Sequence, residues 1–169
     1  MTSGFTPDIA EQIDQLYKTI IKAGKNKAPN IKVAEASKGI ENVQRDVNIS
    51  IVNELALIFD HVGIDTKDVL EPAGTKFNFL QYKPRLVGGH CRSVDPFYLV
   101  HKAVQLGHHP NVILSGRRVN YSMPAILASK VIKFLIGKDI LIKGANSLII
   151  GVTFKEICSD VRNTKVVDV

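Results

Sequence analysis

Residues 40–63 read IENVQRDVNISIVNELALIFDHVG, and this stretch decides the fold. Its apolar side chains recur every three or four positions, which is the spacing of one face of an α-helix. The series is Ile40, Val43, Val47, Ile51, Leu55, Ile58 and Val62. Gly63 then supplies a stop, so one helix is predicted from about residue 31 to residue 62. A second apolar flank (Ile49, Val52 and Phe59) indicates the spine of a bundle or a dimer interface.

Shorter helical patterns lie on both sides of this long one. Thr6-Pro7 predicts the cap and first turn of a helix that runs toward Gly24. Further helices are expected from Asp65 or Thr66 to just before Gly74, from Pro96 to Leu106, and over about residues 123–136. Residues 75–94 have no clean period and are predicted to form an ordered loop, a kind of segment that often carries function.

The character of the chain changes near residue 147. Residues 147–152 read SLIIGV, a short apolar run ending in Gly that is typical of a buried strand. Another apolar segment begins at residues 165–169. The predicted fold is therefore mainly α: a helical domain built on one long helix, followed by the first strand and loop of an α/β domain that is cut short.

Composition narrows the class of protein. Of the 169 residues, 45% are hydrophobic and 22% charged, as in soluble globular proteins. No apolar run suggests a membrane span, the N-terminus does not resemble a signal peptide, and the two cysteines form no disulfide pattern, so a reducing, cytoplasmic setting is expected. The net charge of +6 comes from scattered lysines and arginines without a basic stripe, which argues against nucleic acid and suits a phosphate-bearing substrate.

The run Gly88-Gly89-His90-Cys91-Arg92-Ser93-Val94-Asp95 carries the parts of a covalent site. Two glycines let the backbone approach a bound group closely. An imidazole beside the thiol can favour the reactive thiolate, and Asp95 lies four residues further on as an acid or base. The alternative interpretation is a buried structural cysteine after a glycine turn.

Other residues suggest chemistry less specifically. Lys38 and Asn42 are four apart on the long helix and could hold an alkoxide and a water, although a solvated helix face explains them as well. Lys155 and Arg162 follow the predicted strand, where cations meet phosphates; surface charges are the alternative. No metal site is expected, because no second cysteine lies at ligand spacing from Cys91.

These clusters, in this order, resemble the UDP-glucose/GDP-mannose dehydrogenase family over nearly the whole chain. The supporting stretches include residues 31–36, 41–46, 53–59, 73–76 and 86–91. The Gly-Gly-x-Cys motif with Asp four residues on is specific for the family. His90 and the run Asp95-Pro96-Phe97-Tyr98-Leu99 point to the branch that oxidises UDP-N-acetyl-hexosamines, such as UDP-N-acetylmannosamine or UDP-N-acetylgalactosamine dehydrogenase, for surface polysaccharides.

The resemblance implies a role for each matching residue. Cys91 would attack the C6 aldehyde, and oxidation by NAD would leave a thioester. Lys38 and Asn42 would position a water and stabilise the oxyanion, while Asp95 would assist hydrolysis. Gly88 and Lys155 would meet the nucleotide-sugar, and Arg162 would reach the NAD cofactor. The long helix, residues 31–62, would form a homodimer.

The resemblance also implies domain boundaries. Residues 1–24 would be the last helix of an N-terminal NAD-binding domain, residues 25–120 the central dimerisation domain, and residues 121–169 the start of the UDP-binding domain. The sequence has no G-x-G-x-x-G, so the isolated chain is not expected to turn over. A separately encoded Rossmann domain could then be its partner, or the chain is a non-enzymatic dimerising or nucleotide-sugar-binding remnant. Arg92-Ser93 departs from the branch pattern, and Cys158 has no assigned role.

Overall fold

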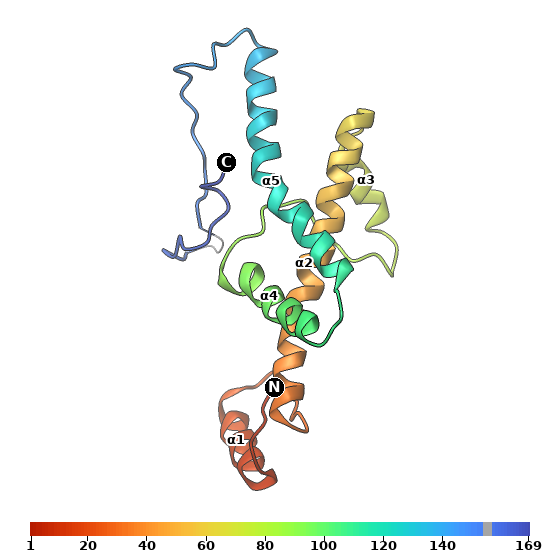
Figure 1. Ribbon diagram of the computed structural model, residues 1–169, viewed down its shortest axis with the longest axis vertical. Coiled ribbons are helices and arrows are strands. Elements are labelled where there is room, and N and C mark those ends of the chain that lie inside the picture. Colours follow the sequence, from red (N-terminus) through yellow and green to blue (C-terminus); the bar gives the residue numbers. More distant parts are fainter. Residues whose placement is uncertain (154–156) are drawn as a thin grey trace. The chain divides into compact units, whose positions relative to one another are not determined.

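The computed structural model describes residues 1–153 and 157–169, without the side chains of residues 90–94. In these ranges five helices follow one another (Figure 1): α1 (Pro7–Ile20), α2 (Ile31–Val62), α3 (Thr66–Ala73), α4 (His90–Gln105) and α5 (Asn111–Ile136). The described residues contain no strand, only one isolated parallel bridge between Thr2 and Lys27. The mainly helical class built on one long helix is therefore confirmed.

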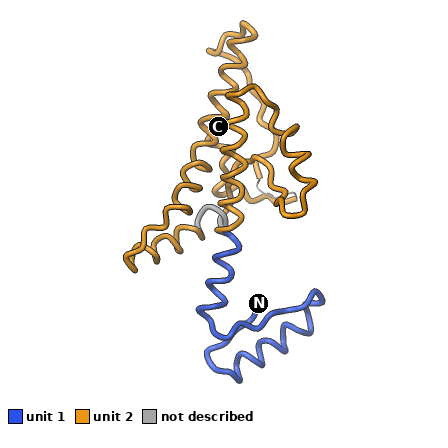
Figure 2. The backbone as a smooth tube through the Cα atoms, turned by 90° about the vertical axis from the view of Figure 1, so that its right-hand side faces the viewer, with its two compact units in different colours: residues 1–42 blue, residues 43–169 orange. Residues whose placement is uncertain are grey.

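The chain divides into two compact units, residues 1–42 and residues 43–169 (Figure 2). The division falls inside α2, which contributes its first turns to one unit and its longer remainder to the other. Each unit has its own set of contacts, and these are described separately.

The first unit is fastened by polar contacts between α1 and the loop after it. Thr6 caps α1, because its hydroxyl accepts a hydrogen bond from the Ile9 amide at 3.3 Å. Asp14 on α1 accepts from the Thr2 hydroxyl at 2.6 Å and pairs with Lys25. The bond from Lys25, together with that from Thr2, lowers the pKa of Asp14. Since α1 buries no residue of its own, these polar contacts hold it.

The second unit is built where α2 and α5 cross. Gly116 of α5 lies against Ser50 of α2 so closely that a Cβ at position 116 would be 2.8 Å from the Ser50 hydroxyl. Ile49 and Val52, from the second flank of the long helix, are buried here. Further along the same pair of helices, Lys130 of α5 forms an ion pair with Asp60 of α2 at 2.7 Å. A glycine thus lets two long helices approach each other at the centre of the unit.

Helix boundaries match the sequence predictions for the first three helices and differ for the last two. The expected helix from Asp65 or Thr66 to before Gly74 is α3, with Asp65 accepting from the Lys67 amide at 2.7 Å. By contrast, α4 begins at His90 rather than at Pro96, and the loop expected over residues 75–94 ends sooner. Pro96 sits inside α4, so it does not mark the helix start. Likewise, α5 starts at Asn111, about one dozen residues before the predicted boundary near residue 123.

The strand expected at residues 147–152 is not formed in the described chain. Leu148 and Ile150 are more than four-fifths exposed there. A strand exists only through its hydrogen bonds to a neighbour, and no other described segment pairs with this one. One contact is recorded nearby: the Thr164 hydroxyl donates to the Val152 carbonyl at 2.6 Å. The sequence contains the apolar run, but no described segment of the structure pairs with it as a neighbouring strand.

The close crossing at Gly116 generates a prediction about stability. Gly116→Val should lower the free energy of unfolding by about 1–3 kcal/mol, because the added carbons must displace Ser50 and separate the helices. The matched control is Gly39→Val on α2, since a Cβ built at Gly39 meets no atom within 4 Å. Urea unfolding followed by circular dichroism measures both. Equal effects of the two substitutions would contradict the close packing.

Candidate active site

Gly88 and Gly89 lead into α4 and pack against a distant segment of the second unit. Gly89 has a φ of 87°, which favours glycine, and its amide donates to the Asn163 carbonyl at 2.9 Å. A Cβ on Gly88 would lie 2.8 Å from the same carbonyl oxygen and 3.0 Å from the Lys165 amide nitrogen. Close packing therefore favours glycine at position 88, and the backbone conformation favours it at position 89. Gly88 was predicted to meet the nucleotide-sugar, and that role stays a prediction.

Cys91 and Asp95 both belong to α4, one turn apart near its beginning. Residues four apart share one face of a helix, so the spacing noted in the sequence becomes a common side of α4. Asp95 is half-buried and the following Pro96 is buried. The side chain of Cys91 lies outside the described part of the structure. Because a helix N-terminus favours anionic groups, the position of Cys91 in the first turn is compatible with a reactive thiol.

Lys38 and Asn42 lie one turn apart on the portion of α2 that belongs to the first unit. The Lys38 side chain is 62% exposed and pairs with Glu41, whereas Asn42 is buried. Lys38 therefore lies on a solvent-exposed face of the helix, as the alternative interpretation predicted, whereas Asn42 does not. The pair belongs to one unit and Cys91 with Asp95 to the other, so their union in a single site stays a prediction.

Of the two residues predicted to meet phosphates, the structure describes only Arg162. Lys155 falls outside the described residues. The Arg162 side chain is 85% exposed, and its guanidinium forms a two-pronged contact with Asp160 at 2.9 Å and 2.8 Å. The Asp160 carboxylate raises the pKa of Arg162. Cys158, in the same loop, is a half-buried free thiol.

A buried polar cluster in the second unit was missed in the sequence. Asp46 of α2, which is fully buried, accepts from the Arg117 guanidinium at 3.1 Å. Asn120, one turn further along α5, donates to the Asp46 carboxylate at 2.8 Å and to its backbone carbonyl at 3.0 Å. The Arg117 guanidinium lies 5.2 Å from the ring centre of Phe97 and 4.4 Å from that of Tyr121. The cluster therefore ties α2, α4 and α5 together.

Burial raises the pKa of Asp46, and the neighbouring Arg117 charge and the Asn120 hydrogen bond oppose the rise. A buried charge of this kind is tolerated only beside a partner charge, which Arg117 supplies, while Asp46 Oδ2 accepts no hydrogen bond among the described residues. The available signal in the sequence was spacing. Asp46 lies three residues before the buried Ile49, so both lie on the same side of α2. Arg117 and Asn120 are also three residues apart and share one side of α5. Polar residues thus occur at helical spacing on the buried sides of both helices.

Asn53, two turns beyond Asp46 on α2, extends this cluster to the loop before α4. Its side-chain amide donates to Asn120 Oδ1 at 2.9 Å and to the Arg85 carbonyl at 3.0 Å. Its side-chain oxygen accepts from the Arg85 amide at 2.8 Å. Asn53 is fully buried, so these bonds are shielded from water. Three residues separate Arg85 from Gly89, the residue just before α4.

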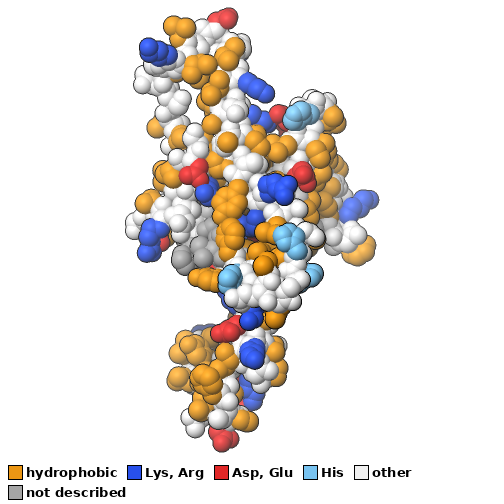
Figure 3. All heavy atoms as spheres, in the orientation of Figure 1, with side chains coloured by type: hydrophobic (Ala, Val, Ile, Leu, Met, Phe, Trp, Pro, Cys, Tyr) orange, Lys and Arg blue, Asp and Glu red, His pale blue; other side chains and the backbone are white. Residues whose placement is uncertain are grey.

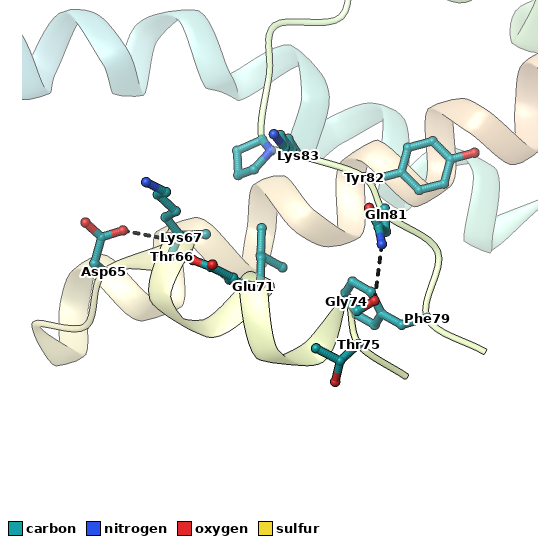
Figure 4. Close-up of a pocket in the computed structure, with 12 residues that line it drawn as sticks. Asp65, Thr66, Lys67, Glu71, Gly74, Thr75, Phe79, Gln81, Tyr82 and Lys83 are labelled. Carbon is teal, nitrogen blue, oxygen red and sulfur yellow. Dashed lines mark hydrogen bonds between the residues drawn. The ribbon is translucent and has the colours of Figure 1, made fainter. Parts of the chain in front are cut away.

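A hollow in the described chain lies away from the predicted site residues (Figure 4). It measures about 890 Å³ and lies between α3 and the loop of residues 74–84, where Gln81 donates to the Gly74 carbonyl at 3.1 Å. Its wall mixes the aromatic rings of Phe79 and Tyr82 with charged groups such as Lys67 and Glu71. None of the predicted site residues lines it. Among the described residues, no group of three or more His, Cys, Asp or Glu side chains could hold a metal ion.

One described helix, α5, is long and apolar enough to cross a membrane by length and composition alone. The sequence analysis underestimated this length because it began the helix near residue 123 instead of at Asn111. Core helices of soluble proteins pass the same test. Since α5 buries Gly116, Arg117 and Asn120, its contacts favour a core helix.

The long α2, the glycine pair before α4 and the cysteine in the first turn of α4 are the features by which the sequence resembles a class of nucleotide-sugar dehydrogenases. The model of the UDP-glucose/GDP-mannose dehydrogenase family, central domain, matches residues 32–122. The chain belongs to this family.

Relatives with known names fall in the acetamido-sugar branch. The chain is 57% identical over its full length to UDP-N-acetyl-D-glucosamine 6-dehydrogenase of Pseudomonas aeruginosa and 54% identical to protein CapL of Staphylococcus aureus. It spans 40% of the length of each. Among solved structures, it is similar to a UDP-D-ManNAc dehydrogenase from Pyrococcus horikoshii (TM-score 0.83, 28% identity), covering 98% of this chain and 39% of that one. The resemblance inferred from the motifs is therefore confirmed.

The buried ion pair generates a prediction with a direct neighbour as control. Arg117→Ala should cost about 3–5 kcal/mol of unfolding free energy, because it leaves the Asp46 carboxylate buried without its partner charge. Arg118→Ala should stay within about 0.5 kcal/mol, since Arg118 is exposed. Urea unfolding at neutral pH compares the two variants.

Acid should reduce the deficit of the Arg117→Ala variant. The pKa of Asp46 is raised in the folded state above the ordinary 3.8, so the folded protein binds a proton that the unfolded chain has released. This group therefore contributes most to stability below pH 3.8, and the contribution is lost as pH rises through the folded pKa. A deficit of Arg117→Ala that grows on acidification would contradict this assignment.

Proposed function

We propose that the chain is the substrate-side part of an NAD-dependent dehydrogenase that oxidises the C6 alcohol of a UDP-N-acetyl-hexosamine to the uronic acid, for surface polysaccharide synthesis in the cytoplasm. One observation carries the proposal: Cys91 stands in the first turn of α4, two residues after Gly89, with Asp95 one turn further on. Family membership and relatives named as 6-dehydrogenases support it.

In the proposed reaction Cys91 acts after the alcohol has become an aldehyde. Its thiolate attacks the C6 carbonyl carbon, a C–S bond forms, and the carbonyl oxygen takes a proton to give a thiohemiacetal. Loss of a hydride from C6 and of the hydroxyl proton leaves a thioester. A water then attacks the thioester carbon while Asp95 accepts one of its protons. The C–S bond breaks to release the thiolate and the carboxylic acid, which gives its remaining proton to the solvent. NAD, when bound, accepts the hydride in each of the two oxidations.

Lys38 and Asn42 are proposed to hold the water and the developing oxyanion. Asn42 supports this role because a buried amide can present a fixed dipole without reorganising solvent. Lys38 can join it if its exposed pair with Glu41 opens, and such surface pairs are weak. Gly88 and Lys155 are proposed to lie along the nucleotide-sugar.

The chain's own residues fit NAD only in part. Arg162 is exposed and cationic, as a contact to phosphate requires, but its guanidinium is engaged by Asp160. The sequence has no G-x-G-x-x-G to hold the pyrophosphate. We propose that residues 1–24 form the last helix of an NAD-binding domain. Residues 25–120 would form the central domain, and residues 121–169 would open the UDP-binding domain.

A homodimer through α2 is the second part of the proposal, and the burial pattern of the helix favours it. Ile49 and Val52 of the second flank are buried within the chain, whereas Ile51, Ile58 and Val62 of the main apolar series are at least half exposed. These three share one face of α2. Hydrophobic side chains gather on the visible surface of the chain (Figure 3). A second copy presenting the same face would cover them, as two-fold symmetry requires.

A second candidate is a non-enzymatic module that dimerises or binds a nucleotide-sugar. Residues 1–169 contain no G-x-G-x-x-G, and neither dimerisation nor nucleotide-sugar binding would require one. The two candidates differ in whether a supplied NAD-binding domain restores turnover.

We expect NADH formation from NAD and UDP-N-acetyl-hexosamines when the chain is combined with the NAD-binding domain of a relative. Cys91→Ala should abolish it, and Asp95→Asn should lower the rate by about 10²- to 10⁴-fold through loss of the general base. Cys158→Ala is the matched control and should keep the rate. A folded sample that stays silent with every UDP-sugar would favour the non-enzymatic module.

Sedimentation analysis tests the dimer. Ile58→Glu should shift the chain toward monomer, because it places a charge in the centre of the exposed apolar face. Lys102→Glu introduces the same negative group on exposed α4 and should leave the assembly unchanged. Dimerisation that survives Ile58→Glu and Ile51→Glu together would exclude this face.

A further inference from the structure

The segment of residues 85–89, which leads into α4, is fixed at both of its ends. At the first end, Asn53 of α2 bonds both the amide and the carbonyl of Arg85, at 2.8 Å and 3.0 Å. At the other, the Gly89 amide donates to the Asn163 carbonyl at 2.9 Å. Val87, between the two, is buried. A loop held in this way has little freedom to shift the helix that it introduces.

The Arg85 end has the stronger support. Asn53 is itself fully buried and held by Asn120, whose amide group is in turn held by the carboxylate and the carbonyl of Asp46. Each side chain in this row is oriented by the next one, since an amide has distinct donor and acceptor ends. The Arg117–Asp46 ion pair closes the row at its buried end. Asn53 thus links the position of the Arg85 backbone to the side chains packed between α2 and α5.

We propose that Asn53 is a positioning residue for Cys91: its two bonds to the Arg85 backbone set where α4 begins and so where the backbone of Cys91, in the first turn of α4, is placed. The inference rests on the proposed role of Cys91 as the nucleophile. A side chain that merely filled space in the core would not need to satisfy both polar groups of one loop residue. A nucleophile, by contrast, has to be held to a fraction of an ångström, which requires support from residues behind it.

The test is the rate at which iodoacetamide alkylates each cysteine of the full chain, read by mass spectrometry at a temperature where every variant is folded. In Asn53→Ala the segment before α4 loses both bonds, so the first turn frays more often. Cys91 should then react about three- to tenfold faster, the factor expected for a lost net hydrogen bond. Cys158 should react at its original rate and serves as the internal reference.

Asn48→Ala is the matched control, because Asn48 lies on the same helix and its side chain bonds the Gln44 carbonyl within α2. It should change neither rate. An unchanged Cys91 rate in folded Asn53→Ala would overturn the proposal. So would an equal acceleration of both cysteines, because a purely structural role acts through global opening and does not distinguish them.

Hydrogen exchange on the unaltered chain keeps the proposal testable if Asn53→Ala does not fold. The Arg85 amide should exchange more slowly than that of its exposed neighbour Lys83, and equal exchange would overturn the inference. Neither measurement needs NAD, a UDP-sugar or another domain. A failure of the dehydrogenase assay would therefore be distinguishable from a failure of the positioning role.

Discussion

The ion pair between Asp46 and Arg117 is the interaction on which the second unit depends. It places two charges inside the crossing of α2 and α5, where each would be costly alone. Because Asn120 and the rings of Phe97 and Tyr121 complete its surroundings, the pair also fixes the angle at which α4 meets the other two helices. An apolar contact could give comparable stability but would not fix these orientations so specifically.

The same arrangement connects stability to the proposed chemistry. From Asp46 the polar row passes through Asn120 and Asn53 to the backbone of Arg85, and the loop from there enters α4 at the glycine pair. Gly88 is needed because the segment near Asn163 approaches too closely for a side chain, and Gly89 because its φ is 87°. The Gly-Gly-x-Cys motif that identifies the family therefore also serves the fold. Its two glycines are needed for the local structure whether or not they contact a substrate.

Sequence reasoning predicted the elements that depend on local pattern. The apolar series of residues 40–62 gave α2, and the Gly-Gly-x-Cys run gave the family. It failed where the outcome depends on a partner. Pro96 signals a helix start locally, yet α4 begins at His90, and residues 147–152 have the composition of a strand without a neighbour to pair with. Asp46 and Asn53 were overlooked because their importance arises only when α5 and the loop at Arg85 come beside them.

Cys91 is proposed to form a covalent bond to the sugar, and trapping that bond on the protein is the decisive experiment. The chain carrying Asp95→Asn, which should slow hydrolysis, would be mixed with a relative's NAD-binding domain, NAD and UDP-N-acetylglucosamine, then digested for mass spectrometry. The account predicts an added uronyl group on the Cys91 peptide and none on Cys158. NADH formation without any adduct at Cys91, or an adduct on Cys158 instead, would contradict it.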